Sequence, residues 1–226
     1  MFKVADLFDL SQTDHAALFV SDGPAWEALP HIKDYLAETL KPAILATVSP
    51  QAIVGENVSI GEGTIVAAGA CIEGPAIIGS NCQIRHNAYI RAHVIVGDNC
   101  VVGNACELKN ALLFNDCQVP HFNYVGDSIL GRHAHLGAGV VLSNFKSLPG
   151  NVAVQNGNDK IDTRLRKFGA LIGDHTEIGC NCVLNPGSIL GRYCVVYPNT
   201  NWRGVLAPGH IVKNAAQKQV IAKREE

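Results

Sequence analysis

Aliphatic residues followed directly by glycine recur through most of this 226-residue chain, and within each of two sets their separations are multiples of six. The two sets are out of phase by four residues, because 28 positions separate Val102 from Leu130. We therefore expect one irregular corner or short loop between them. The first set is Val54-Gly55, Ile60-Gly61, Ile78-Gly79, Val96-Gly97 and Val102-Gly103, and the second is Leu130-Gly131, Leu136-Gly137, Ile172-Gly173, Ile178-Gly179 and Leu190-Gly191.

A small or β-branched residue follows four positions after each of these aliphatic residues. A period of six is not that of a helix, but it describes a short strand and a turn, and three such units close one triangular coil. The pattern is similar to that of the hexapeptide-repeat acyltransferases, and this resemblance implies an all-β fold, a left-handed parallel β-helix. The small residues are Val58, Thr64, Cys82, Cys100, Cys106, Ala134, Val140, Thr176, Cys182 and Cys194.

Five of the eight cysteines occupy this small-residue position. The sequence has no Cys-x-x-Cys pair and no Cys/His spacing typical of a zinc site. We therefore predict buried free thiols, with neither disulfides nor a bound metal.

The repeat predicts the domain organisation. Residues 1–45 lack it and show apolar positions at helical spacing up to Pro42, which predicts a short helical N-terminal segment. The β-helix is expected over residues 46–212. Residues 147–163 interrupt the repeat, which predicts a loop extruded from a coil, either an active-site cover or a solvated excursion. Residues 213–226 are expected to form a frayed tail or short helix.

The charge of the chain excludes some classes of partner. Its formal net charge is −2, which offers no basic stripe for nucleic acid and no polybasic patch for a membrane. No apolar run is long enough to span a bilayer, and acidic residues interrupt the start of the chain, where a signal peptide needs an apolar core. We expect a cytoplasmic protein.

Two polar motifs stand where the glycine-marked repeat lapses. They read Asn104-Ala-Cys-Glu107-Leu-Lys109 and His121-Phe-Asn-Tyr124-Val-Gly126-Asp127. They resemble the acetyltransferase domain of the bifunctional N-acetylglucosamine-1-phosphate uridyltransferase family, as do Arg91, Gly137-Ala-Gly139 with Asn144, and Lys167-Phe168. The resemblance covers roughly residues 45–210. Nothing resembles the glycine-rich nucleotide loop of that family, so we expect no uridylyl transfer.

The resemblance implies acetyl transfer from acetyl-CoA to the amino group of a hexosamine 1-phosphate, most simply glucosamine 1-phosphate, in UDP-N-acetylglucosamine synthesis, by a homotrimer with sites between subunits. His121 suits a general base, because histidine ordinarily titrates near neutral pH. Glu107 would orient or charge-balance the site, and Tyr124 would donate a hydrogen bond to acetyl or sugar oxygens. Arg91, Lys109 and Lys167 suit a sugar phosphate.

The remaining residues implied by the resemblance concern the acceptor and the coenzyme. Asn144 would bind the acceptor, together with His135, which stands where the family has asparagine. Backbone N–H groups near Gly137, Ala138 and Gly139 would stabilise the thioester oxyanion. The coenzyme would run past Cys180 and Pro198, with Arg203 near its phosphates.

Two alternatives stay open at this point, and a third fits poorly. The chain is also compatible with an acyltransferase for another amino sugar or nucleotide sugar, or with a non-catalytic β-helix scaffold. A carbonic anhydrase of the same fold fits poorly, because that family needs a His-x4-His pair and no two of the nine histidines are five positions apart.

Overall fold

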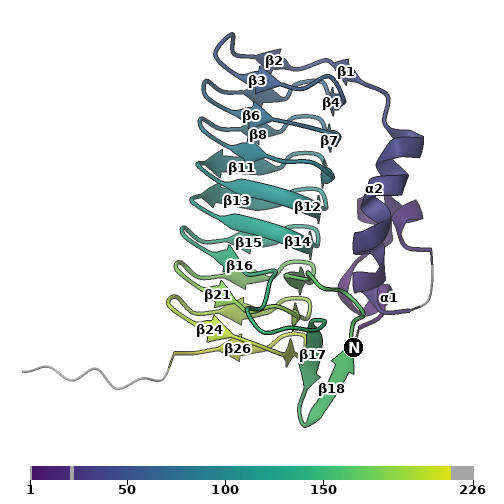
Figure 1. Ribbon diagram of the computed structural model, residues 1–226. Coiled ribbons are helices and arrows are strands. Elements are labelled where there is room, and N and C mark those ends of the chain that lie inside the picture. The colour runs from purple at the N-terminus through teal and green to yellow at the C-terminus, as the bar shows by residue number, and fades with distance from the viewer. Residues whose placement is uncertain (1, 21–22, 215–226) are drawn as a thin grey trace, which may run out of the picture.

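The chain forms a left-handed parallel β-helix, a stack of triangular coils with three flat faces (Figure 1). The repeat predicts the coils, and the resemblance to the hexapeptide-repeat acyltransferases implies their left-handed winding. The computed structural model describes residues 2–20 and 23–214. Most of the predicted tail, residues 215–226, therefore lies outside the described residues. We number the faces in the order in which the chain first meets them.

Face 1 begins with β1, and its strands pair in parallel from coil to coil. Its outward side chains at the middle coils are buried, because the N-terminal helices cover them. The strands are β1 (Ala43–Ile44), β4 (Val58–Ile60), β7 (Ala76–Ile78), β10 (Val94–Val96), the second halves of β12 (Glu107–Leu113) and β14 (Tyr124–Leu130), β19 (Ala170–Ile172), β22 (Ser188–Leu190) and β25 (Val205–Leu206).

Face 2 is a separate parallel sheet. It consists of β2 (Thr47–Val48), β5 (Ile65–Val66), β8 (Gln83–Ile84), β11 (Val101–Asn104), β13 (Gln118–His121), β15 (His135–Leu136), β20 (Glu177–Ile178), β23 (Val195–Val196) and β26 (Ile211–Val212). Face 3 consists of β3 (Ile53–Val54), β6 (Cys71–Ile72), β9 (Tyr89–Ile90), the first halves of β12 and β14, β16 (Val141–Leu142), β21 (Val183–Leu184) and β24 (Asn201–Trp202).

The interior is filled by aliphatic side chains stacked from coil to coil, with small residues near the corners. Some of the small residues at this position donate a hydrogen bond to a backbone carbonyl, and the others are apolar. The Thr64 hydroxyl donates to the Gly79 carbonyl at 2.7 Å, and the Cys100 thiol donates to that of Phe114 at 3.1 Å. All eight cysteines are free and six are buried, so the prediction of buried thiols is confirmed for most of them.

The phase shift between the two sets of repeats has a different origin from the one predicted. Tyr89 to Val94 spans five residues, but the matching segments, Glu107 to Ala111 and Tyr124 to Ser128, span only four. Two successive coils are therefore each one residue short, and the expectation of one irregular corner or loop was wrong. In both coils the strand continues through the shortened corner between faces 3 and 1, which makes β12 and β14 seven residues long.

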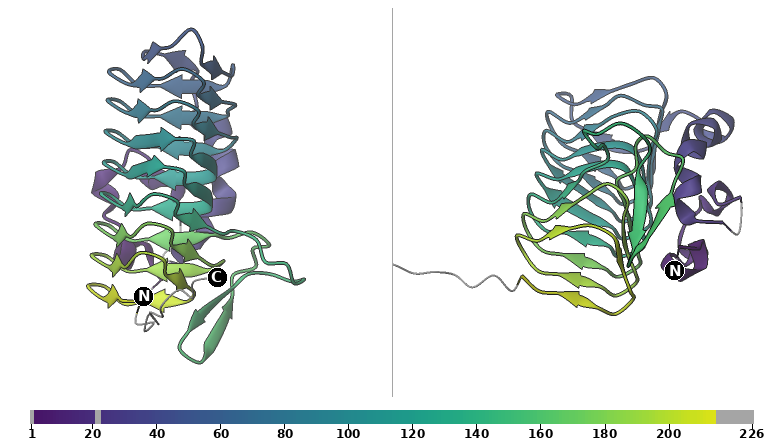
Figure 2. Two further views of the ribbon diagram at one scale, coloured as in Figure 1. Left: turned by 90° about the vertical axis from the view of Figure 1, so that its left-hand side faces the viewer. Right: turned by 60° about the horizontal axis from the view of Figure 1, so that its bottom comes forward.

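The N-terminal segment packs along face 1 (Figures 1 and 2). It contains α1 (Val4–Leu7), three 3-10 turns (Leu10–Gln12, Ala16–Leu18 and Ala25–Glu27) and α2 (Ala28–Thr39). Leu29, Ile32 and Leu36 recur at helical spacing on the buried side of α2, against Leu112 and Ile129 of the β-helix. No helix among the described residues is long and apolar enough to cross a membrane.

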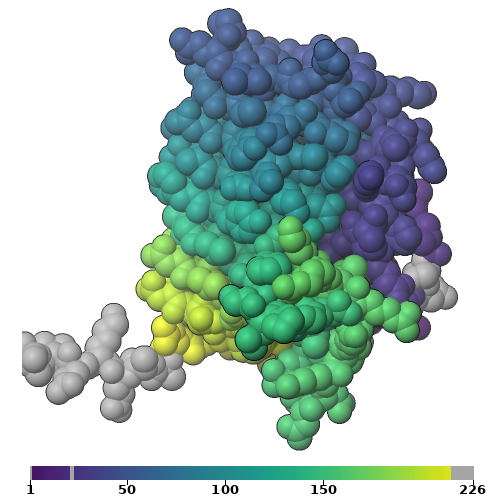
Figure 3. Space-filling model, viewed as in Figure 1, coloured from purple at the N-terminus to yellow at the C-terminus, as the bar shows by residue number. Residues whose placement is uncertain are grey.

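The segment predicted as an extruded loop leaves the stack and contains an antiparallel β-hairpin, β17 (Ala153–Asn156) and β18 (Asp159–Asp162). The hairpin stands out beside the last coils, below the N-terminal helices in the space-filling view (Figure 3). The break in the repeat predicts that the chain leaves the stack here, but it does not predict the hairpin, because the hairpin has no six-residue period.

Candidate functional site

Face 3 brings together most of the predicted site residues at its middle coils. Glu107 and Tyr124 are register partners on this face, and both side chains are partly exposed. Arg91 and Lys109 follow at the corner with face 1, and His121 ends β13 at the opposite corner, with face 2. The predicted base, tyrosine and cations therefore lie across one face of the prism.

The corner between faces 3 and 1 holds a buried polar network around Asp127, which is 5% exposed. Its carboxylate accepts hydrogen bonds from the side-chain amides of Asn110, at 2.9 Å, and Asn144. The Lys109 ammonium lies 3.5 Å from the same carboxylate. Asn110 and Asp127 both take up a left-handed backbone conformation, with φ of 45° and 46°, which these residue types tolerate better than most.

This network lies where the two coils are one residue short. Asn110, Asp127 and Asn144 are 17 residues apart, so the shortened coils stack them above one another. Asp127 and Asn110 were not among the predicted site residues. The recurrence of Asn or Asp every 17 residues is the sequence signal that identifies them.

Tyr124 lies beside this network because residue 126 has no side chain. A Cβ atom at Gly126 would come within 2.6 Å of both the Tyr124 hydroxyl and the Asn144 amide nitrogen. Burial raises the pKa of Tyr124, and the nearby carboxylates of Glu107 and Asp127 raise it further. The phenol is therefore neutral at pH 7 and can donate a hydrogen bond.

The other predicted acceptor residues are placed as follows. Arg91 forms an ion pair with Glu107 at 2.9 Å. Lys167 is exposed and directly precedes Phe168, whose N–H binds the Asn144 carbonyl, so it also lies near this corner. His135 is not part of this group. It lies on face 2, where its Nδ1 is 2.7 Å from a Glu177 carboxylate oxygen.

Three predicted coenzyme residues form one column with His121. Gly139 N–H binds the His121 carbonyl, Asn181 N–H binds that of Ala138, and Asn199 N–H binds that of Cys180. His121, Ala138, Cys180 and Pro198 therefore follow one another on successive coils along the corner between faces 2 and 3. Arg203 does not join this column but lies at the opposite corner, on the line of Lys109 and Gly126.

The same hydrogen bonds narrow the choice of oxyanion donor. The N–H of Gly137 binds the Ile178 carbonyl, and that of Gly139 binds His121. The Ala138 N–H has no hydrogen bond within residues 2–20 and 23–214. Of the three predicted donors, Ala138 is therefore the one available to a substrate.

The fold and the site together define a class of protein, the hexapeptide-repeat β-helices, here with a polar site on one open face. The sequence comparisons give the relatives. The family model of the GMPPB C-terminal domain matches residues 72–161. A bifunctional sugar-1-phosphate nucleotidylyltransferase/acetyltransferase from Sulfurisphaera tokodaii is 33% identical over 90 residues, which are 40% of this chain and 22% of that protein.

Two further similarities were found, one to a sequence and one to a solved structure. The bifunctional protein GlmU from Methanococcus vannielii is 33% identical over 94 residues, which are 39% of this chain and 22% of that protein. The structure of UDP-N-acetylglucosamine acyltransferase from Campylobacter jejuni aligns with a TM-score of 0.44 and 16% identity, over 73% of this chain and 70% of that one. The resemblance predicted from the motifs is confirmed, and the chain spans about a fifth of the length of the curated relatives it matches.

Proposed function

We propose that the chain transfers an acetyl group from acetyl-CoA to the amino group of a hexosamine 1-phosphate, most simply glucosamine 1-phosphate. One observation carries the proposal. A single face of the prism presents a histidine and the Ala138–Cys180–Pro198 column at one corner, a tyrosine at its centre, and Arg91 and Lys109 at the other corner. Acetyl transfer to a phosphorylated amino sugar needs a base, an oxyanion donor and phosphate-binding cations, and these are the groups available.

The chemical step assigns a role to each side of the face. The sugar amine attacks the thioester carbonyl, the new C–N bond forms, and the C–S bond breaks to release the coenzyme thiolate. His121 accepts the proton that the nitrogen loses and passes it to the leaving thiolate. The Ala138 N–H binds the oxyanion of the tetrahedral intermediate. The Tyr124 hydroxyl donates a hydrogen bond to the acetyl or sugar oxygen.

The acceptor phosphate is assigned to the cationic corner. Arg91 and Lys109 are partly exposed and each is balanced by one carboxylate, Glu107 and Asp127 respectively, so they remain able to bind an incoming anion. Lys167 adds an exposed cation beside them. Asn144 holds Asp127 and lies next to the Tyr124 hydroxyl, which suits it to position the sugar.

Acetyl-CoA is assigned to the column that begins at His121. At the usual spacing between paired strands, the three steps from His121 to Pro198 span about 14 Å along the outside of the prism. Lys213 lies near the far end of this column, with its ammonium 5.9 Å from the centre of the Tyr197 ring. The thioester would lie beside His121 and Ala138, with the rest of the coenzyme toward Pro198.

We further propose that the working form is a homotrimer. Face 1 is covered by the helices of the same chain, so faces 2 and 3 are the ones left for neighbouring subunits. Phe122, which is 60% exposed at the corner next to His121, provides an apolar contact for a neighbour. Light scattering at micromolar concentration tests this, and a monomeric mass would contradict it.

The direct test of the activity is thiol release from acetyl-CoA in the presence of glucosamine 1-phosphate, with the product identified by its mass gain of one acetyl group. A panel with glucosamine 6-phosphate, free glucosamine and amino nucleotide sugars identifies the acceptor. Turnover of glucosamine 1-phosphate alone supports the proposal as stated, and turnover of another acceptor alone would replace the substrate. Absence of acetyl-CoA binding would indicate a scaffold instead.

A further inference from the structure

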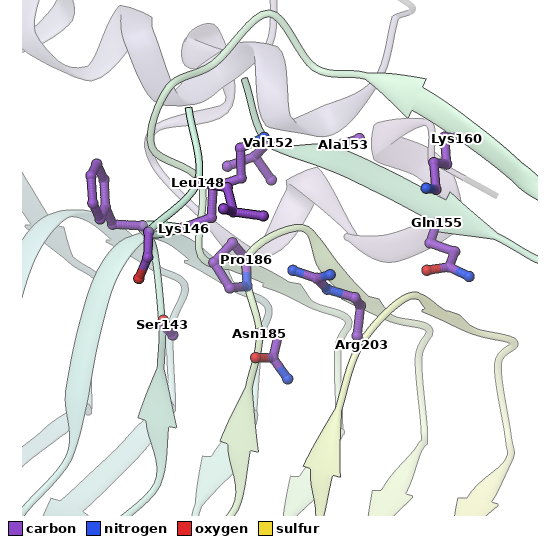
Figure 4. Close-up of a pocket in the computed structure, with 12 residues that line it drawn as sticks. Ser143, Lys146, Leu148, Val152, Ala153, Gln155, Lys160, Asn185, Pro186 and Arg203 are labelled. Carbon is purple, nitrogen blue, oxygen red and sulfur yellow. The ribbon is translucent and has the colours of Figure 1, made fainter. Parts of the chain in front are cut away.

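A groove of about 650 Å³ lies between the extruded hairpin and the last coils of the β-helix (Figure 4). We call it the hairpin groove. Ser143, Asn185 and Arg203 follow three successive strands of face 3 and form one side, while Ala153, Gln155 and Lys160 come from the hairpin. The loop residues from Phe145 to Leu148, with Val152 and Pro186, complete the lining.

The hairpin, which forms one wall of the groove, lies in close contact with the last coils of the β-helix. Gly187 and Gly204 lie directly beneath β17, where an added Cβ atom would come within 2.9 Å of the carbonyl oxygens of Ala153 and Gln155. Val152 and Val154 are buried in the same apolar cluster as the N-terminal helices. The hairpin is therefore packed onto the body of the protein, and the groove is built into the fold.

The groove is cationic. Lys146, Lys160 and Arg203 line it, and no Asp or Glu does among the described residues. Within the same part of the chain none of these three cations forms an ion pair. Three unpaired cations around one concavity attract a ligand with more than one negative charge.

The groove also has an apolar wall and polar groups. Phe145, Leu148, Val152 and Pro186 provide apolar surface, and Gln155 and Asn185 provide side-chain amides. A flat heterocyclic base suits the apolar wall, the amides can bind its polar edge, and a diphosphate suits the cations. A groove of this volume is large enough for a nucleotide.

The groove continues from the proposed acceptor site. Lys109, Gly126, Ser143, Asn185 and Arg203 are successive register positions along one corner of the prism. Asn144, which binds Asp127, lies between Ser143 and Phe145 of the groove lining. This corner is across face 3 from the column assigned to acetyl-CoA. A ligand with its sugar at Asn144 and its sugar phosphate at Lys109 can therefore extend from that phosphate into the groove.

We propose that the hairpin groove binds a nucleoside diphosphate group of a substrate. Its position assigns that group to a nucleotide-sugar acceptor, in which the phosphate of a hexosamine 1-phosphate carries a nucleoside monophosphate. The inference therefore extends the acceptor of the proposed function and rests on that function for the identity of the amino sugar. Coenzyme A carries the same chemical group, an adenosine diphosphate unit, and is the second possible source.

The test is calorimetric titration of the whole protein with UDP and, separately, with coenzyme A. Neither titration requires acetyl transfer, so the result is independent of whether glucosamine 1-phosphate is turned over. The variants are Lys160→Ala and Arg203→Ala, and the matched control is Lys41→Ala, which removes an exposed lysine outside the groove. Melting temperatures of all three variants confirm that they are folded.

Each groove variant should raise the Kd for the ligand that occupies the groove by about five- to tenfold, and Lys41→Ala should not. Loss of UDP affinity identifies a nucleotide-sugar acceptor, and loss confined to coenzyme A supports the site with the coenzyme as its source. Unchanged affinities for both ligands in both groove variants would overturn the proposal.

Discussion

Removal of the buried carboxylate of Asp127 tests whether the network at the shortened coils holds this corner together. In Asp127→Ala the amides of Asn110 and Asn144 and the ammonium of Lys109 lose their common acceptor. Breaking a buried charged network by removing one partner costs several kcal/mol. Because the Lys109 side chain is 25% exposed and can be partly rehydrated, we expect about 3 kcal/mol for this loss. The left-handed backbone adds about 1 kcal/mol for alanine.

Asp116→Ala is the matched control. Asp116 has φ of 65°, and its carboxylate lies 3.0 Å from Arg132 Nε and 3.6 Å from His133 Nε2, but its side chain is 23% exposed. Alanine at position 116 has the same cost for the left-handed backbone conformation, whereas the surface ion pairs that Asp116→Ala loses contribute only about 0–1 kcal/mol. We therefore expect Asp127→Ala to be less stable than Asp116→Ala by about 2–3 kcal/mol, or about 4–12 °C in Tm for a chain of this size.

Urea unfolding of both variants at one fixed protein concentration measures the difference, because an oligomer's apparent stability depends on concentration. Asp127→Asn separates charge from backbone, since asparagine tolerates the left-handed conformation but cannot accept from every donor at once. The free energy of unfolding of Asp127→Asn should lie between those of the wild type and Asp127→Ala. If the free energies of unfolding of Asp127→Ala and Asp116→Ala agree within about 1 kcal/mol, the network does not stabilise the corner.

Three further outcomes are expected. Gly126→Ala should raise the KM for the acceptor more than that for acetyl-CoA, because its Cβ displaces Tyr124 and Asn144, and equal changes would remove this corner from the acceptor site. Lys109→Ala should weaken acceptor use by about 1.5–3 kcal/mol with little effect on acetyl-CoA, as steady-state kinetics with each substrate varied will show. A thiol reagent should label exposed Cys180, and bound acetyl-CoA should protect it. Cys182, whose pKa is raised by burial, should stay unlabelled until the protein unfolds. Labelling of Cys180 at the same rate with and without acetyl-CoA would contradict the assignment of the coenzyme to this column.

The repeat predicts the coils because each six-residue unit forms one strand and one corner, so aliphatic residues such as Ile78 and Val96 are stacked whatever the turns between them contain. The helix that begins at Ala28 is similarly visible, because Leu29, Ile32 and Leu36 repeat at its period. Local sequence pattern is sufficient for both.

The sequence alone does not locate the phase break. A separation of 28 residues fits a four-residue insertion as well as two single deletions, and only the pairing of β12 and β14 distinguishes them. The network around Asp127 depends on that pairing. Likewise, the separation of Arg203 from Cys180 and Pro198 follows from which corner each residue occupies, which the linear motif does not specify.

The two histidines at positions 121 and 135 provide the most direct test of the account. His121 lies at the corner of face 3 beside Ala138, whereas His135 lies on face 2 and is paired with Glu177. With acetyl-CoA and glucosamine 1-phosphate, His121→Ala should lower kcat by about 10²–10⁴-fold if His121 is the base, as proposed. The melting temperature should stay unchanged, because the side chain is exposed. His135→Ala should retain kcat near that of the wild type. Near-normal turnover by His121→Ala, together with loss of turnover in His135→Ala, would contradict the assignment of the reaction to face 3.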